Sequence, residues 1–251
     1  MTESAKAKNT IIDARQRIIV ALDVETAHEA RRLVDDLSAS VGAFKIGLQL
    51  FTSAGPAFVR ELTGAGVKIF LDLKFHDIPN TVANAAIEAA KLRVWMFNVH
   101  VSGGPEMIRR TADDLRAFCL KEGIDRPELI GVTVLTSSDR DMLNSVGVGH
   151  EVSDQVLRLA KLASECGLDG VVASPLETVL IRKAIPDGRF LIVTPGIRPN
   201  FATHDDQKRV NTPSEALSAG SDYLVIGRPI TAAENPRNAV EQILSEIAVH
   251  N

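Results

Sequence analysis

The sequence predicts an α/β protein with the fold of a single-domain (βα)8 (TIM) barrel. Three observations favour this fold: eight short runs rich in apolar and β-branched residues, amphipathic helical stretches between them, and no glycine-rich turn after the first run. Strands that alternate with helices over short connections form parallel sheets. Eight such units in 251 residues match the usual size of a closed barrel.

The candidate strands are nearly continuous apolar runs. Such runs are typical of parallel strands that are covered by helices on one side and by packed side chains on the other. In chain order they are residues 18–22, 43–47, 68–73, 96–100, 129–134, 170–173, 190–194 and 223–226.

The candidate helices carry apolar residues at helical spacing. The first, 26–37, opens on Thr26, a good N-cap, and repeats apolar residues at positions 30, 33, 34 and 37. The others are predicted at 56–63, 82–92, 105–121, 152–166, 176–184, 213–219 and 239–249. Glycine or proline stands at many of the junctions, which favours short turns there.

The main alternative is an open doubly wound sheet, which usually has fewer strands and often a GxGxxG turn after the first. Here the first strand runs into Asp23 without such a turn, so the barrel is favoured. No linker of low complexity divides the chain. We therefore assign residues 1–15 to a polar N-terminal tail and residues 16–251 to one barrel domain.

The composition excludes several classes of protein. The formal net charge is −4, which does not indicate a general nucleic-acid or membrane-surface binder. No apolar run is long enough to span a bilayer, and the N-terminus lacks a signal-peptide core. Cys119 and Cys166 lie far apart and are expected to be free, buried thiols. We expect a cytoplasmic protein without nucleic-acid or membrane partners.

Charged residues gather at the ends of the predicted strands, where barrel enzymes carry their chemistry. The strongest signal is KIFLDLKFHDIPNT, residues 68–81. Asp72 and Lys74 are two apart on a strand and face one side, and Asp77 follows in the loop. With Lys45, two lysines and these two aspartates can alternate in charge and hold one another ionised.

This cluster has two interpretations. One is a structural ion pair at a strand end. The other is a shared site, which is favoured because five or more polar groups follow successive strands and unpaired buried charges are costly. Such an array can place an ammonium proton donor beside a substrate carboxylate or carbanion.

A second signal follows the last two strands, in TPGIRP at 194–199 and IGRP at 226–229. Glycine-rich turns at these positions are the usual phosphate site of a barrel, with backbone N–H groups directed at the anion. Arg228 adds a charged fork that suits phosphate oxygens. An ordinary turn glycine beside a surface arginine is the alternative.

The histidines do not indicate a metal site, because they form no HxH or HExxH pattern. A zinc site is therefore not predicted. His100, at the end of the fourth strand, is either catalytic or a packed histidine that bonds a neighbouring group.

The stretch DLKFHDIPNT resembles the hallmark motif of the orotidine 5′-phosphate decarboxylase family. The resemblance covers nearly the whole chain outside the N-terminal tail. Five further segments are similar to the bacterial enzymes and occur in the same order: VALDV around Asp23, FKIG around Lys45, TVLTS around Thr136, TPGIRP around Arg198 and VIGRPI around Arg228. The resemblance implies a (βα)8 barrel that converts orotidine 5′-phosphate to UMP and CO2 without a metal or cofactor, as the last step of UMP synthesis.

The resemblance also implies the roles of the charged cluster. Lys74 would protonate C6 of the pyrimidine as the carboxylate leaves, and Asp72 would lie near that carboxylate. Family members are usually homodimers with shared active sites, so Asp77 and Thr81 would reach the site of the partner subunit.

The remaining substrate contacts follow from the same resemblance. Lys45 and Asp23 would contact the ribose and position the charged network. Either Thr136 or Ser137 would contact the base. The 5′-phosphate would be held by Arg198, Gln207, Arg228 and the backbone of Gly227.

A rival class shares the DxKxxD barrel: magnesium-dependent sugar-phosphate decarboxylases and aldolases that work through an enediolate. The IPNT and PGIRP segments argue against that class. A non-enzymatic rival, a barrel that only senses a phosphate ligand, would need the phosphate site but not the Asp72–Lys74 pair.

Overall fold

Eight parallel strands close into one barrel in the computed structural model, which describes residues 14–201 and 211–249. Each strand pairs with the next along the chain and β8 pairs with β1, so the predicted (βα)8 barrel is confirmed. The strands are β1 (Ile18–Ala21), β2 (Ala43–Gly47), β3 (Ile69–Phe75), β4 (Met96–His100), β5 (Glu128–Val132), β6 (Gly170–Val172), β7 (Leu191–Pro195) and β8 (Tyr223–Ile226).

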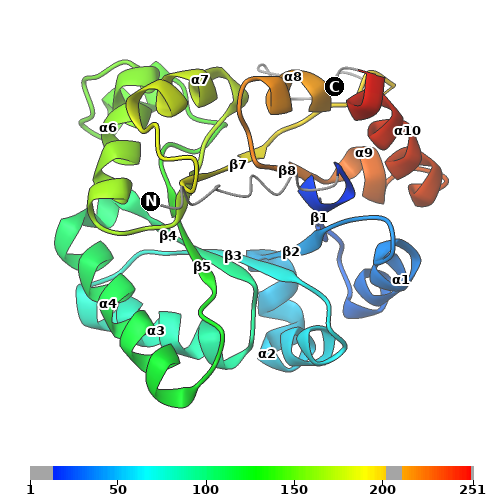
Figure 1. Ribbon diagram of the computed structural model, residues 1–251, viewed down its shortest axis with the longest axis horizontal. Helices are drawn as coiled ribbons and strands as arrows, with labels where there is room; N and C mark the ends of the chain where they lie inside the picture. Colours follow the sequence, from blue (N-terminus) through cyan, green and yellow to red (C-terminus); the bar gives the residue numbers. More distant parts are fainter. Residues whose placement is uncertain (1–13, 202–210, 250–251) are drawn as a thin grey trace, which may run out of the picture.

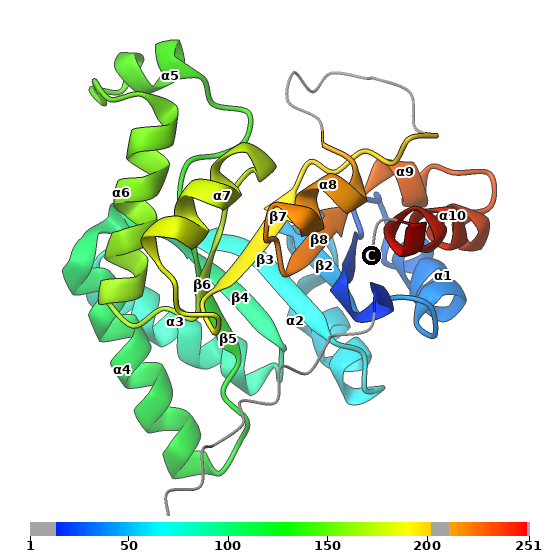
Figure 2. The same ribbon diagram turned by 45° about the horizontal axis from the view of Figure 1, so that its top comes forward.

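Helices surround the strands on the outside (Figure 1). The α-helices are α1 (Ala27–Leu37), α2 (Leu48–Gly64), α3 (Pro79–Lys91), α4 (Gly104–Glu122), α5 (Arg140–Ser145), α6 (Val152–Glu165), α7 (Pro175–Ala184), α8 (Pro213–Ser218), α9 (Arg228–Thr231) and α10 (Pro236–Val249). Two 3-10 helices, η1 (Ala14–Arg17) and η2 (Val101–Gly103), precede β1 and α4. Figure 2 shows α5 standing away from the strands, beyond one end of α6.

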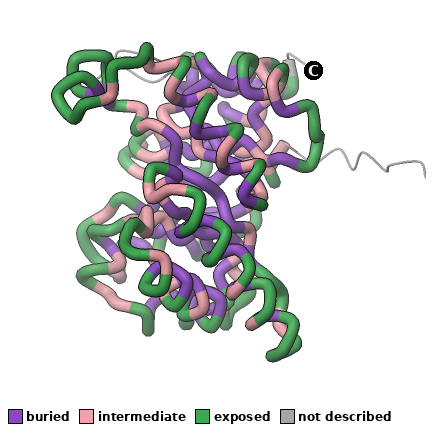
Figure 3. The backbone as a smooth tube through the Cα atoms, turned by 90° about the vertical axis from the view of Figure 1, so that its left-hand side faces the viewer, coloured by how far each residue is buried: buried purple, intermediate pink, exposed green. Residues whose placement is uncertain are grey.

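The buried residues form two apolar layers, one between strands and helices and one inside the barrel. Buried chain accordingly runs through the middle of the molecule in Figure 3, with exposed segments outside. Burial of each large apolar side chain stabilises the folded state by about 1.5–3 kcal/mol. The inner layer consists of Ile19, Ala21, Ala43, Phe70, Met96, Ile130, Val193 and Val225.

A polar layer lies on top of this apolar floor. Side chains of a strand alternate between its two faces, so the residue two positions after an inward one also points inward. On three neighbouring strands these next positions are Lys45, Asp72 and Asn98. The fold therefore brings three polar side chains to the carboxyl ends of β2, β3 and β4, directly above the apolar interior.

The segment 56–63 was predicted as a helix that begins at Pro56. The α2 range starts earlier, at Leu48, but Gly55 within it is not helical, with φ of 69° and ψ of −179°, and divides the range into two helical segments. Glycine adopts a positive φ at little cost, and proline suits the first position of a helix. The second segment therefore starts at Pro56, as predicted, and the first, from Leu48, was not predicted.

Two short helices were not predicted. The α5 helix is only six residues long and is capped by the side chain of Asp139, which accepts a hydrogen bond from Met142 N. The α9 helix is four residues long. Both helices are too short for a helical repeat of apolar residues to be recognised in the sequence.

Two smaller predictions are confirmed, the N-cap of α1 and the free, buried cysteines. Thr26 caps α1, where its hydroxyl accepts a hydrogen bond from Glu29 N at 3.2 Å. Cys119 and Cys166 are free and buried. Within the described residues, no helix combines the length and apolar character needed to cross a bilayer. Most of the predicted tail, residues 1–13, lies outside the described residues.

Candidate active site

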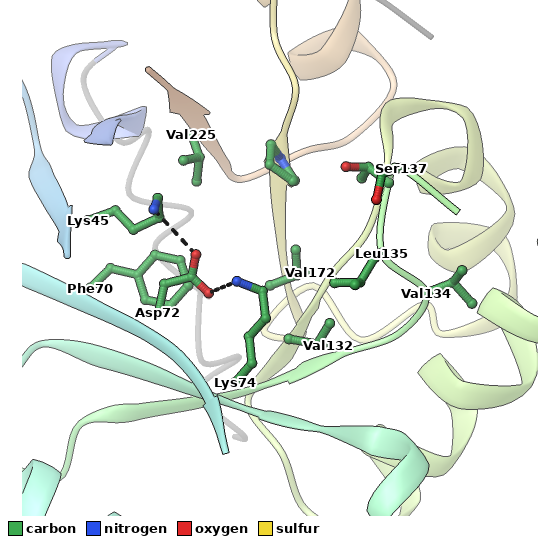
Figure 4. A pocket seen from close by; sticks show the side chains of 12 residues that line it. Lys45, Phe70, Asp72, Lys74, Val132, Val134, Leu135, Ser137, Val172 and Val225 are labelled. Carbon is green, nitrogen blue, oxygen red and sulfur yellow. Dashed lines mark hydrogen bonds and ion pairs between the residues drawn. The ribbon is translucent and has the colours of Figure 1, made fainter. Parts of the chain in front are cut away.

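Four charged side chains form a chain of alternating sign at the carboxyl ends of β1 to β3. Lys45 Nζ lies 3.0 Å from Asp23 Oδ1 and 3.4 Å from Asp72 Oδ2. Lys74 Nζ lies 2.7 Å from Asp72 Oδ1. Figure 4 shows Asp72 between the two lysines, with both pairs marked by dashed lines. The structure thus brings together four of the residues that the sequence singled out.

Within a single chain, the predicted array of charges is wrong in one residue. We expected Asp72 and Asp77 to alternate with the two lysines, but the second aspartate of the observed array is Asp23. Asp77 lies in the exposed loop after β3, where its carboxylate accepts a hydrogen bond from Ile78 N at 2.6 Å. Thr81, in the first turn of α3, is also exposed. The loop carries Asp77 beyond the strand end, so a spacing of three residues does not return it to Lys74.

Asp72 is held as a carboxylate although its side chain is only 13% exposed. Burial alone would favour the neutral acid, but the positive charges of Lys45 and Lys74 outweigh burial and hold the pKa of Asp72 below its usual value. Hydrogen bonds from Lys74 and Asn98 act in the same direction. The pocket therefore contains a fixed negative charge between two ammonium groups.

Lys74 sits on a bulge in β3. Between Leu71 and Phe75 the pairing with β4 advances by only two residues, from Phe97 to Val99. Lys74 itself has φ of 52°, a left-handed conformation that is uncommon for a residue with a side chain. Bulges re-aim side chains next to active sites. This one directs Lys74 Nζ at Asp72.

The pocket around the pair is mostly apolar. Its walls come from six strands and from the loop after β5, which contributes Thr136 and Ser137. Figure 4 shows Val132, Val172 and Val225 lining the space near the Asp72–Lys74 pair. A site with few water-facing polar groups strengthens the electrostatic effect of the charges it holds. Among residues 14–201 and 211–249, no group of three or more His, Cys, Asp or Glu is placed to hold a metal ion.

The residues predicted to hold a phosphate follow β7 and β8. Arg198 is 9% exposed, and its backbone N–H donates to Asn211 O at 3.1 Å. Gly227 follows β8 and is the N-cap of α9, and Arg228 is the first residue of that helix. Arg228 lines a second depression together with Asp23, which also pairs with Lys45. Asp23 thus lies between the lysine pocket and the Arg228 depression. Gln207 lies outside the described residues.

Asn98 was not among the site residues predicted from the sequence. This residue of β4 is 1% exposed and bonds both Asp72 and Lys74. The signal in the sequence was an amide in the middle of the apolar run MFNVH, where a polar side chain needs buried partners.

His100 is a packed histidine near the site. Its ring lies 5.4 Å from the ring of His76. Burial, then the neighbouring His76 and Lys74, lower the pKa of His100, and Asp72 opposes them in part.

The lowered pKa of His100 predicts a loss of stability in acid. As pH falls through about 6.5, the unfolded chain takes up a proton that the folded site resists. The free energy of unfolding therefore decreases until pH reaches the folded pKa. We expect the substitution His100→Gln to reduce this loss by roughly 0.5 kcal/mol, since the half-exposed ring is partly screened by solvent.

Urea unfolding between pH 8 and pH 5 measures this effect. His150→Gln, at an exposed histidine before α6, is the matched control and is expected to retain the wild-type slope. An identical pH slope in the wild type and His100→Gln would contradict the prediction.

A closed barrel whose strand ends hold paired lysines and aspartates beside a pocket defines a barrel enzyme. Comparison with known proteins gives the family. Residues 16–243 match the family described as "Orotidine 5′-phosphate decarboxylase / HUMPS family". The chain belongs to this family.

Named relatives agree with the assignment. The chain is 52% identical over 236 residues to a protein of Trichlorobacter lovleyi named orotidine 5′-phosphate decarboxylase, covering 94% of this chain and 96% of the relative. A crystal structure of orotidine 5′-phosphate decarboxylase from Lactobacillus acidophilus is similar with a TM-score of 0.80 and 42% identity, covering 92% of this chain and 98% of that one. The crystal structure of orotidine 5′-phosphate decarboxylase from Pyrococcus horikoshii OT3 is similar with a TM-score of 0.71 and 26% identity. The match covers 92% of this chain and 99% of that one.

Proposed function

We propose that this protein is a carboxy-lyase that converts orotidine 5′-phosphate to UMP and CO2, the last step of de novo pyrimidine nucleotide synthesis. The observation that carries the proposal is the ionised Asp72 held between Lys45 and Lys74 in a largely apolar pocket. Relatives that are 52% and 53% identical in sequence to this chain, over nearly its whole length, are named after this activity.

The charge arrangement suits the chemistry of this reaction. Loss of CO2 from C6 of the pyrimidine leaves an electron pair on a carbon with little delocalisation. A preorganised ammonium stabilises the developing carbanion more than the ground state, and that difference accelerates the reaction. Lys74 then donates a proton to C6, so the C–C bond to the carboxylate is replaced by a C–H bond. In this proposal Asp72 repels the substrate carboxylate and so favours its loss.

The rest of the substrate is assigned to the neighbouring residues. Asp23 and Lys45 contact the ribose, and Thr136 or Ser137 contacts the base. Arg198, Gln207, Arg228 and the backbone of Gly227 hold the 5′-phosphate. Binding of this remote group supplies energy for ordering the reacting centre. Arg198 follows β7 and Arg228 follows β8, the usual phosphate position of a barrel, which supports this assignment.

We further propose a cytoplasmic homodimer in which Asp77 and Thr81 serve the active site of the partner subunit. The exposure of both residues supports this assignment. So does Ile78, a large apolar side chain that is 67% exposed beside Asp77. An exposed apolar residue beside polar ones is typical of a surface that a partner covers.

The experiment that tests the function compares two substrates with and without a chelator. We expect purified protein to form UMP from orotidine 5′-phosphate at the same rate in EDTA and in magnesium. It should show no turnover of 3-keto-gulonate 6-phosphate under either condition. Loss of UMP formation on chelation, or magnesium-dependent turnover of the sugar phosphate alone, would favour the enediolate class and overturn the proposal.

A further inference from the structure

Asn98 occupies the polar layer at the carboxyl ends of the strands, next to the charged array. It is 1% exposed and lies opposite the apolar Ile130 of β5. Its Oδ1 accepts a hydrogen bond from Lys74 N at 2.8 Å. Its Nδ2 donates to Asp72 Oδ1 at 2.8 Å. One amide therefore bonds the backbone of the lysine and the side chain of the aspartate at once.

The first of these bonds stabilises an unusual backbone. Lys74 has φ of 52°, a strained conformation for a non-glycine residue that persists only where the surrounding structure holds it. The bulge between Leu71 and Phe75 disrupts the regular pairing with β4, and a buried N–H needs an acceptor. The amide oxygen of Asn98 is that acceptor.

The second bond fixes the direction of the carboxylate. Asp72 Oδ1 receives Lys74 Nζ at 2.7 Å in addition to the Asn98 amide. A lysine ammonium is a point charge on a flexible stem and sets no orientation by itself. The Asn98 amide is anchored at its other end by Lys74 N, so it holds the plane of the carboxylate relative to the lysine backbone.

We propose that Asn98 is a positioning residue that sets the geometry of the Asp72–Lys74 pair, and so controls the rate of the chemical step rather than substrate affinity. The kinetic part of this inference rests on the proposed decarboxylation; the structural part does not. Only a group that donates and accepts at the same time can fill the role. An amide does so, a protonated carboxyl does so, an ionised carboxylate only accepts, and an aliphatic side chain does neither.

The test uses N98D and N98L, with Thr111→Val as the matched control. Thr111 is fully buried in α4 and bonds Met107 O, so the control also removes a buried hydrogen bond but lies outside the polar layer. We expect N98L to lower kcat about 10²-fold, the cost of a small misplacement of reacting groups, with KM within about threefold of wild type. The control should stay within about twofold in kcat.

The pH dependence of kcat in N98D distinguishes a positioning role from a merely structural one. The introduced carboxyl would share its surroundings with Asp72, Lys74 and Lys45, and with the His76–His100 pair that is coupled to them. Near pH 8 it is ionised beside Asp72, so kcat should be low. As pH falls it takes up a proton and recovers the donor, so kcat relative to wild type should rise by about tenfold toward pH 5.5.

Normal kcat in N98L, or an N98D-to-wild-type ratio that does not change with pH, would overturn the inference. Crystal structures of N98L and wild type supply the measurement that is independent of the reaction. Lys74 is expected to leave the left-handed region and its Nζ to move away from Asp72. An unchanged Lys74 in N98L would overturn the positioning role even if the wild type failed to act on orotidine 5′-phosphate. If the wild type did not act on orotidine 5′-phosphate but Lys74 moved in N98L as expected, only the proposed function would be contradicted.

Discussion

Replacing Lys74 with alanine is expected to lower kcat for decarboxylation by at least about 10⁴-fold, because the change removes both the proton donor and the charge nearest the carbanion. The fold should persist. Asp72 keeps Lys45 at 3.4 Å and the Asn98 amide at 2.8 Å, so its buried charge is not left alone. The proposed phosphate contacts are untouched, so UMP should still bind.

The measurement combines steady-state kinetics, thermal unfolding and calorimetric binding of UMP. Lys91→Ala is the control, since Lys91 is an exposed lysine of α3 that pairs with Glu88 on the same helix. It should leave all three quantities near wild type. A Lys74→Ala protein that is folded, binds UMP and retains near-normal turnover would contradict the assigned role.

The second large effect concerns which subunit supplies Asp77. If the sites are shared, a heterodimer of one Lys74→Ala subunit and one Asp77→Ala subunit has one intact site and one doubly altered site. Its activity should be about half that of the wild-type dimer. The two subunits can be co-expressed with different tags and purified as the mixed species.

The reciprocal arrangement is the control. A subunit that carries both changes, paired with a wild-type subunit, places one altered residue in each shared site and should be nearly inactive. If instead each chain completed its own site, the two results would be exchanged: the first heterodimer would be inactive and the second half active. Sedimentation of a fully active monomer would also contradict the shared site.

The sequence was sufficient to predict the barrel because its strands are apolar on both faces. The bounds predicted at 43–47, 96–100 and 223–226 are those of β2, β4 and β8. Elsewhere the local pattern was ambiguous. The third strand was predicted at 68–73, with Lys74 counted among its residues; β3 covers Ile69–Phe75 and continues through the bulge at Lys74.

For the site, the residues with charged side chains could be found from their places at strand ends, but their connections could not. Asp23 and Asp77 are equally plausible partners for a lysine in the sequence. Only the pairing of β1 with β2, where Ala21 lies beside Lys45, places Asp23 next to Lys45. Asn98 was missed because its inward direction depends on the strand register, which a five-residue apolar run does not reveal.

The most direct test of the central claim is the reaction itself, carried out in D2O with chelated, purified protein. We expect one CO2 and one UMP per orotidine 5′-phosphate, with deuterium at C6 of the product by NMR, and no such product from Lys74→Ala on the same timescale. Absence of CO2 release by the wild type, or UMP formation that depends on added magnesium, would contradict the claim.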